Sequence, residues 1–217
     1  MTGPVEKETP VSAPAATGSV PRLRELVLVT ANKGKLRDFA FLFEGTGIAI
    51  SLPGDHGVAL DVDETGVTFA ENALLKARAF AAALPGQAVL ADDSGLAVAA
   101  LGGRPGVYSA RYAGEPGDDQ ANNLKVLREM EEQADRRAAF VAVLALRLPD
   151  GEEVVVEGRC EGTLAHAECG TNGFGYDAIF FREDLGRTFG EATPAEKNAR
   201  SHRAAAVRAL LERLDVR

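Results

Sequence analysis

Two neighbouring carboxylates are the first residues of this sequence whose types and spacing could do chemistry. Asp92 and Asp93 follow a short apolar run, residues 88–91, and precede Ser94 and Gly95. Adjacent carboxylates repel each other unless a cation compensates for them, and Mg²⁺ usually takes one or two carboxylates together with substrate phosphates. Because successive strand residues point to opposite faces, we expect only one of the pair to enter a cleft directly. A solvated acidic turn fits the same residues, but the end of a strand is where α/β sheets bind ligands, which favours a functional site.

A second acidic segment could contribute to the same metal site. Glu64 lies in Asp63-Glu64-Thr65-Gly66 and could complete a metal site with Asp93. Lys76 follows on a predicted Ala-rich helix and could face phosphate groups. Charges on such a helix usually form its solvated face, so this alternative remains open for these residues taken alone.

A strand–turn–helix junction near the start of the ordered sequence could bind phosphate. The segment is Thr30-Ala31-Asn32-Lys33-Gly34-Lys35. Free backbone N–H groups at a helix N-terminus attract anions, and a lysine there adds a mobile positive charge. The spacing of a Walker A loop is absent. An ordinary junction with a surface lysine explains the segment about equally well.

Two later segments could bind the base and sugar of a nucleotide. In Gly173-Phe174-Gly175-Tyr176-Asp177, the glycines leave the Phe174 ring open to stack on a planar ligand, and Asp177 can accept hydrogen bonds from a base edge. Lys197 and Ser201-His202-Arg203 could reach phosphate or a purine carbonyl. The alternatives are a core aromatic flanked by turn glycines and a structural histidine.

The elements that must position these residues alternate between strands and helices. Apolar runs predict strands at 26–30, 48–52, 88–91, 138–148, 153–159 and 177–181, with helices at 35–43, 68–84 and about 118–132. Pro149-Asp150-Gly151 indicates a β-hairpin. This order predicts an α/β protein with a mixed sheet. Residues 1–22, rich in Pro, Ala, Ser, Thr and Gly, are expected to be a disordered extension ahead of one domain, residues 23–217.

The C-terminal segment is predicted to form two helices. Thr193-Pro194-Ala195-Glu196 has the pattern of a capping box. In one continuous helix, Lys197 and His202 would lie about 140° apart and could not serve one site. A second helix that begins after Ser201 places His202 and Arg203 in its first turn.

Charge and composition exclude several classes of protein. The chain has 217 residues and a net charge of −8, which does not suit binding to long nucleic acids. No apolar run approaches the roughly 20 residues that cross a membrane. The two cysteines, Cys160 and Cys169, lack metal-site spacing and are expected to be free thiols in a reducing compartment, which predicts a cytoplasmic protein.

Taken in order, these segments resemble the inosine triphosphate pyrophosphatase family, the HAM1-like noncanonical purine NTP pyrophosphatases. The resemblance covers about residues 26–214. Its matching segments are residues 30–35, Glu64-Thr65-Gly66, residues 68–73, Lys76-Ala77-Arg78, residues 91–96, residues 101–114, residues 173–177, Lys197-Asn198 and Ser201-His202-Arg203. Ala178, Gly190 and Ala204 depart from the family's usual residues without removing a charged or metal-binding group.

The resemblance implies a fold, an activity and a set of roles. The fold is α/β, with a long central mixed β-sheet, two α/β lobes and the active cleft between them, and the protein is a homodimer. Asp93 is implied as proton acceptor and, with Glu64, as metal ligand for Mg²⁺. The implied substrate contacts are Thr30, Ala31, Asn32, Lys33, Gly34, Lys35, Lys76, Ser94, Phe174, Gly175, Tyr176, Asp177, Lys197, His202 and Arg203.

The expected reaction is hydrolysis of ITP, dITP or XTP to the nucleoside monophosphate and pyrophosphate. Selectivity is expected from donors in residues 174–176 and from Arg203, which would pair with a carbonyl at purine position 6 and stay unpaired against adenine. A Maf-like pyrophosphatase acting on other nucleotides, a nucleotide-binding regulator without turnover and a structural domain remain as alternatives.

Overall fold

Seven strands form one mixed sheet in a computed structural model that describes residues 23–115 and 117–216. The predicted N-terminal extension, residues 1–22, lies outside the described residues. The strands are β1 (Glu25–Val29), β2 (Ala49–Ser51), β3 (Val89–Val98), β4 (Arg137–Arg147), β5 (Glu153–Leu164), β6 (Phe180–Arg182) and β7 (Arg187–Thr188). Their order is β2-β1-β3-β4-β5-β6-β7, with β2, β1 and β3 parallel and the remaining pairs antiparallel. The predicted mixed sheet is therefore confirmed.

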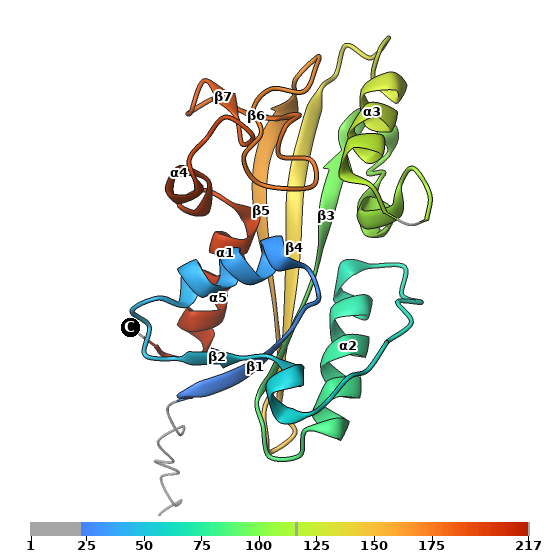
Figure 1. The fold of residues 1–217 in the computed structure, drawn as a ribbon. Coiled ribbons are helices and arrows are strands. Elements are labelled where there is room, and N and C mark those ends of the chain that lie inside the picture. The colour runs from blue at the N-terminus through green and yellow to red at the C-terminus, as the bar shows by residue number, and fades with distance from the viewer. Residues whose placement is uncertain (1–22, 116, 217) are drawn as a thin grey trace, which may run out of the picture.

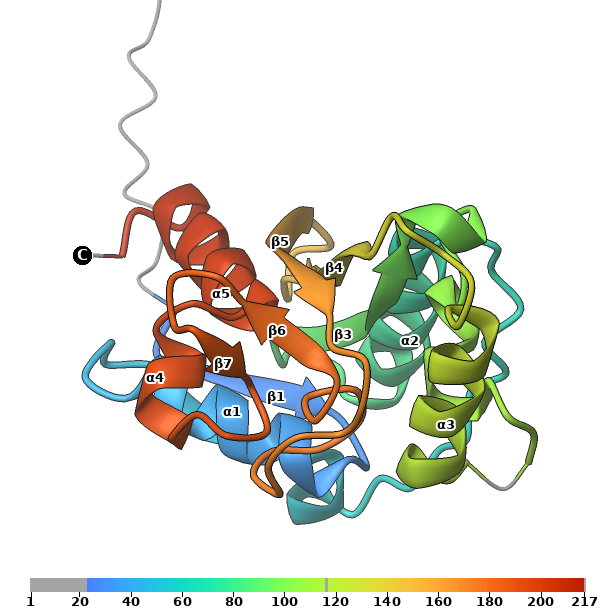
Figure 2. The same ribbon diagram turned by 90° about the horizontal axis from the view of Figure 1, so that it is seen from above.

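Helices cover both faces of this sheet. They are α1 (Lys33–Phe43), α2 (Phe69–Ala83), α3 (Asp119–Glu129), α4 (Pro194–Asn198) and α5 (His202–Arg213). Figures 1 and 2 show α1, α4 and α5 on one side of the long strands and α2 on the other, while α3 lies beside the half of β3 that is farther from β1. Within the described residues, no helix combines the length and the apolar character needed to cross a membrane.

The long strands β3, β4 and β5 join two lobes, because their two ends pack into different cores. On β4, Leu144 packs with α1 and α5, whereas its neighbour Val143 packs with α2 on the opposite face. Phe140, nearer the other end of β4, belongs to a third core with α3 and β6. Val143 and Leu144 face opposite sides of the sheet because successive side chains of a strand alternate between its two faces. The expected two-lobed α/β architecture is thus present.

One glycine lets the last helix lie directly on the sheet. A Cβ atom at Gly158 of β5 would stand 2.2 Å from the backbone of His202 and of Ala206 on α5. A side chain there would push α5 away from the sheet, so this glycine determines how close the α5 N-terminus comes to the centre of the molecule.

The C-terminal prediction is confirmed in detail. Thr193 caps α4 with the reciprocal Glu196 contact of a capping box, and Ser201 caps α5 through a 3.1 Å bond from the Ala204 N–H to its Oγ. The chain therefore turns between the two helices, and His202 and Arg203 occupy the first turn of α5.

Three predicted strand boundaries were wrong. The strand predicted at residues 153–159 continues to Leu164 as β5, because its later residues pair with β4 and β6. The strand predicted at residues 88–91 continues to Val98, so Asp92 and Asp93 lie inside β3 and not at its end. The full antiparallel pairing of β3 with β4 provides backbone partners along this length, and cations compensate both carboxylates. The strand predicted at 177–181 begins only at Phe180 as β6, because Asp177 belongs to a turn.

Candidate active site

A cavity of about 840 Å³ lies between the lobes and brings distant parts of the sequence together. Most of the predicted site residues line it: Thr30, Ala31, Asn32, Lys35, Glu64, Lys76, Asp93, Ser94, Phe174, Gly175, Tyr176, Asp177, Lys197, His202 and Arg203. The other two do not. Lys33 is exposed outside the cavity lining, and Gly34 is buried, where a Cβ atom would stand 2.4 Å from the Phe174 ring.

The N-terminus of α1 holds Lys35 at the edge of the cavity. Asn32 caps the helix, since its side-chain oxygen accepts hydrogen bonds from the N–H groups of Gly34 at 2.8 Å and Lys35 at 3.0 Å. The first turn contains no acidic residue, so the partial positive charge of the helix end is not neutralised locally. Lys35 extends from this turn to β3, where its Nζ lies 2.6 Å from the Asp92 carboxylate.

Asp92 is a fully buried carboxylate that orients cations on one face of β3. Its Oδ2 accepts a 3.0 Å bond from the Ser94 hydroxyl, and Arg203 Nε stands 4.0 Å away. Burial acts to raise the pKa of Asp92, but the charges of Lys35 and Arg203 outweigh it and hold that pKa well below its usual range. Asp92 is therefore ionised throughout the neutral range.

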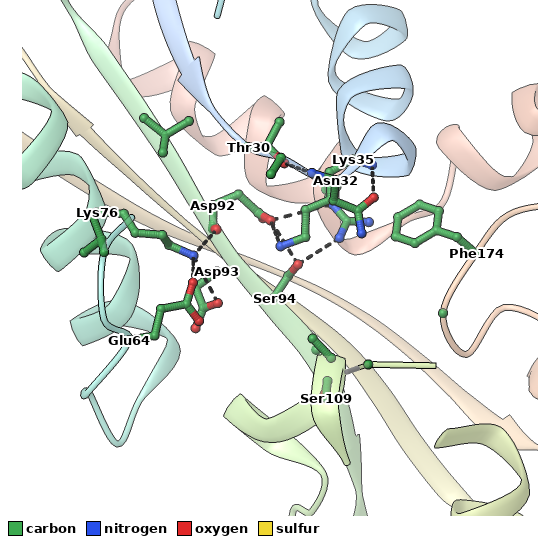
Figure 3. A pocket seen from close by; sticks show the side chains of 18 of the residues that line it. Thr30, Asn32, Lys35, Glu64, Lys76, Asp92, Asp93, Ser94, Ser109 and Phe174 are labelled. Carbon is green, nitrogen blue, oxygen red and sulfur yellow. Dashed lines mark hydrogen bonds and ion pairs between the residues drawn. The ribbon is translucent and has the colours of Figure 1, made fainter. Parts of the chain in front are cut away.

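Asp93 points to the opposite face, toward α2. Lys76 Nζ lies 3.4 Å from Asp93 Oδ1, 2.7 Å from Glu64 Oε1 and 2.8 Å from the Asp92 carbonyl oxygen. Asn72 donates to the second Asp93 oxygen at 3.2 Å. Figure 3 shows Lys76, Glu64 and Asp93 on one side of β3 and Lys35 and Ser94 on the other. Burial raises the pKa of Asp93, although Lys76 and Lys35 oppose that effect.

Glu64 and Asp93 together fit a divalent cation. Both carboxylates converge on one position, which the Lys76 ammonium holds in this structure. Burial acts to lower the pKa of Lys76, but the charges of Asp93 and Glu64 outweigh it and raise that pKa. Within the described residues, no cluster of three or more metal-binding side chains is present. Two carboxylates alone suit Mg²⁺, which completes its shell with water and substrate phosphates.

Phe174 and three charged residues form the other end of the cavity. Lys197 Nζ lies 4.5 Å from the centre of the Phe174 ring and the Arg203 guanidinium 5.2 Å from it. Lys197 is also paired with the buried Asp177 carboxylate at 2.5 Å, and the Phe174 N–H donates to the same Asp177 oxygen at 2.9 Å. The resulting surface combines an aromatic face with cations, which suits a planar heterocycle that carries phosphates.

The first turn of α5 supplies two buried nitrogens without partners. The His202 ring stacks on Phe140 with centroids 4.8 Å apart, and burial lowers the pKa of His202 well below its usual value, so the imidazole is neutral. Arg203 donates to Ser94 Oγ at 2.8 Å and to Asp38 Oδ2 at 3.2 Å. His202 Nδ1 and Arg203 Nε have no hydrogen-bond partner among the described residues. Buried nitrogens of this kind are available to a ligand.

The structure adds residues that sequence reasoning did not single out. Asp38 pairs with Arg203 and, at 3.7 Å, with Lys197. It lies three residues after Lys35 on α1, so the shared helix face was a usable signal. Asp119 of α3 also lines the cavity, and it accepts the Gly175 N–H at 2.6 Å. Nothing in its sequence spacing indicates that contact.

Known proteins match most of this chain. The dITP/XTP pyrophosphatase of Bacillus anthracis is 47% identical over 196 residues, which cover 88% of this chain and 96% of that protein. The protein of the same name from Streptomyces coelicolor is 50% identical over 193 residues, 87% of this chain and 96% of its own. The Staphylococcus aureus Ham1 protein has a similar structure, with a TM-score of 0.79, 43% identity and coverage of 88% and 98% of the two chains.

A match to a family model agrees with these pairwise similarities. The model described as the Ham1 family matches residues 26–213. This range contains all the strands and helices described above, apart from Glu25, the first residue of β1. The match therefore includes the α1 N-terminus, β3, the Phe174 segment and the α5 N-terminus that line the cavity. This chain belongs to the Ham1 family.

Proposed function

We propose that this protein hydrolyses the noncanonical purine nucleoside triphosphates dITP, XTP and ITP to the nucleoside monophosphate and pyrophosphate. The observation that carries the proposal is the cavity itself. It joins a carboxylate pair suited to Mg²⁺ at one end, lysines beside it, and an aromatic ring with cations at the other end. The relatives named dITP/XTP pyrophosphatase support this choice of substrates.

In the proposed reaction, Asp93 accepts a proton from the water that attacks the α-phosphorus. The Asp93 carboxylate lines the cavity beside Lys76, which places it to accept that proton. Asn72 orients it through the bond to its second oxygen. Mg²⁺ held by Glu64 and Asp93 would neutralise the negative charge that develops on the leaving pyrophosphate.

Lysines on the two faces of β3, both beside the Asp92–Asp93 pair, hold the triphosphate in this proposal. Lys35 stands at the positive end of α1, where the Asn32 side chain caps the helix. Lys76 balances the charges of Glu64 and Asp93. Phosphoryl transfer depends on such positioning and charge neutralisation and needs no covalent intermediate on the protein.

Selectivity in the proposed pocket comes from side-chain donors. Backbone N–H groups of residues 174–176 were expected to contribute to it, but two of the three have other partners. The Phe174 and Gly175 N–H groups already donate to Asp177 and Asp119, so they are not free for a base. Arg203 and His202 have the unpaired nitrogens, and they are the groups we assign to the carbonyl at purine position 6.

Pyrophosphate release from ITP, XTP, GTP, ATP and dTTP, with Mg²⁺ and with EDTA, tests the proposal. We expect strong release from ITP and XTP, little from ATP and dTTP, and none with EDTA. A Maf-like preference for other nucleotides, or tight ITP binding without release, would contradict it. The second outcome would favour a nucleotide-binding regulator.

We further propose that the protein acts in the cytoplasm as a homodimer. The free Cys160 and Cys169 are consistent with a reducing compartment. Light scattering on the purified chain tests the dimer, with twice the mass of 22.8 kDa as the expected result and the single mass as the contradiction.

A further inference from the structure

Helix α3 binds both sides of one glycine in the Phe174 loop, residues 173–177. Asp119 Oδ2 accepts the Gly175 N–H at 2.6 Å, and Asn123 Nδ2 donates to the Gly175 carbonyl at 3.2 Å. Asp119 and Asn123 are four residues apart and therefore share one face of α3. Gly175 has a φ of +60°, a conformation that favours glycine. The two contacts hold the loop in this turn.

The opposite side of the same loop carries the aromatic ring into the cavity. The Phe174 ring packs on the backbone of Gly34 and lies beside Lys197 and Arg203. Its position therefore depends on two anchors. Contacts with α1, α4 and α5 act on the ring, while α3 acts on the peptide group that follows it.

The two neighbouring carboxylates at the start of α3 have different partners. Asp118 caps the helix, since its Oδ1 accepts the Ala121 N–H at 2.9 Å. Asp119 bonds across 56 residues of sequence to Gly175. Asp118 is sufficient to cap α3, so capping of this helix does not explain why a second aspartate stands at position 119.

We propose that Asp119 is a positioning residue that fixes the Phe174 ring for stacking on the nucleotide base. This inference rests on the proposed function, because it concerns the base end of the same cavity. Asp119 does not touch the reacting phosphates in this account. It acts through the Gly175 N–H, with Asn123 as the second support.

The test compares Asp119→Ala with two matched variants. Loss of one such bond should raise KM for ITP about five- to tenfold and leave kcat within about twofold. Asp119→Asn, which keeps an oxygen acceptor, should restore most of the native KM. Asp118→Ala should lower the melting temperature through loss of the cap but leave KM unchanged.

A second measurement does not need catalysis. Hydrogen exchange of the Gly175 amide, followed by NMR, should accelerate in Asp119→Ala and stay slow in Asp118→Ala. Calorimetry with inosine monophosphate as the probe should show weaker binding in Asp119→Ala alone. If wild-type protein cleaves no triphosphate, the proposed function fails, while these two readouts still test Asp119.

Three results would overturn the inference. Native KM and native Gly175 exchange in Asp119→Ala would show that the bond has no positioning role. An equal KM increase in Asp118→Ala would attribute the effect to helix stability. A fall in kcat alone would place Asp119 in the chemical step.

Discussion

Replacing Lys35 with methionine should destabilise the folded protein as well as weaken phosphate binding. Asp92, its partner at 2.6 Å, has a side chain with 0% exposure. Removing one member of a buried pair leaves an uncompensated charge and typically costs about 3–5 kcal/mol. Arg203 and Ser94 stay close to Asp92, so we expect a lower cost, about 2–3 kcal/mol. For a chain of this length, that cost lowers the melting temperature by about 4–12 °C.

The assay is urea and thermal unfolding at pH 7, with two companion variants. Lys35→Met combined with Asp92→Asn should recover much of the lost stability, because the double variant removes both charges. Arg78→Met is the matched control. Arg78 pairs with Glu153 at 2.8 Å, but its side chain is 57% exposed, so its loss should cost far less. If Lys35→Met is no more destabilising than Arg78→Met, or if adding Asp92→Asn gives no recovery, the buried pair does not stabilise the fold.

Three further predictions concern the cavity. Asp93→Asn should lower kcat by about 10²- to 10⁴-fold with a near-native melting temperature, and a native rate would contradict its role. Gly34→Ala should raise KM for ITP by about two- to tenfold, because its Cβ would stand 2.4 Å from the Phe174 ring; an unchanged KM would contradict this packing. His202 is buried and neutral when folded but binds a proton when unfolded, so stability should fall as pH drops below about 6.5, by up to about 1.4 kcal/mol per pH unit. His202→Gln should reduce that slope and His56→Gln, at an exposed site, should not; equal slopes in both would refute the assignment.

The order of elements could be predicted because local sequence signals were strong. Thr193 and Ser201 predicted the starts of the two C-terminal helices, because their hydroxyls accept hydrogen bonds from N–H groups that lack partners at every helix N-terminus. The end of β3 could not be predicted in the same way. Two adjacent carboxylates normally indicate the end of a buried strand. Here Lys35 and Lys76 compensate for them, but these lysines lie 57 and 16 residues before Asp92, so the sequence does not show that they pack against it.

The candidate site was predictable in part for a related reason. Residues of recognisable type, such as Lys35, Asp93 and Phe174, could be assigned because the ordered motifs resemble one family. The contacts among them depend on tertiary packing. Neither the pairing of Lys76 with Glu64 nor the use of the Gly175 N–H by Asp119 has a signature in sequence spacing.

A competition experiment between ITP and ATP tests whether the protein is selective for noncanonical purines. The purified protein is given equal concentrations of ITP and ATP with Mg²⁺, and the nucleotides and phosphates are separated by chromatography over time. We expect ITP to disappear first and to yield inosine monophosphate and pyrophosphate in equal amounts while ATP persists. Loss of both nucleotides at equal rates, or release of inorganic phosphate with inosine diphosphate, would contradict the proposed function.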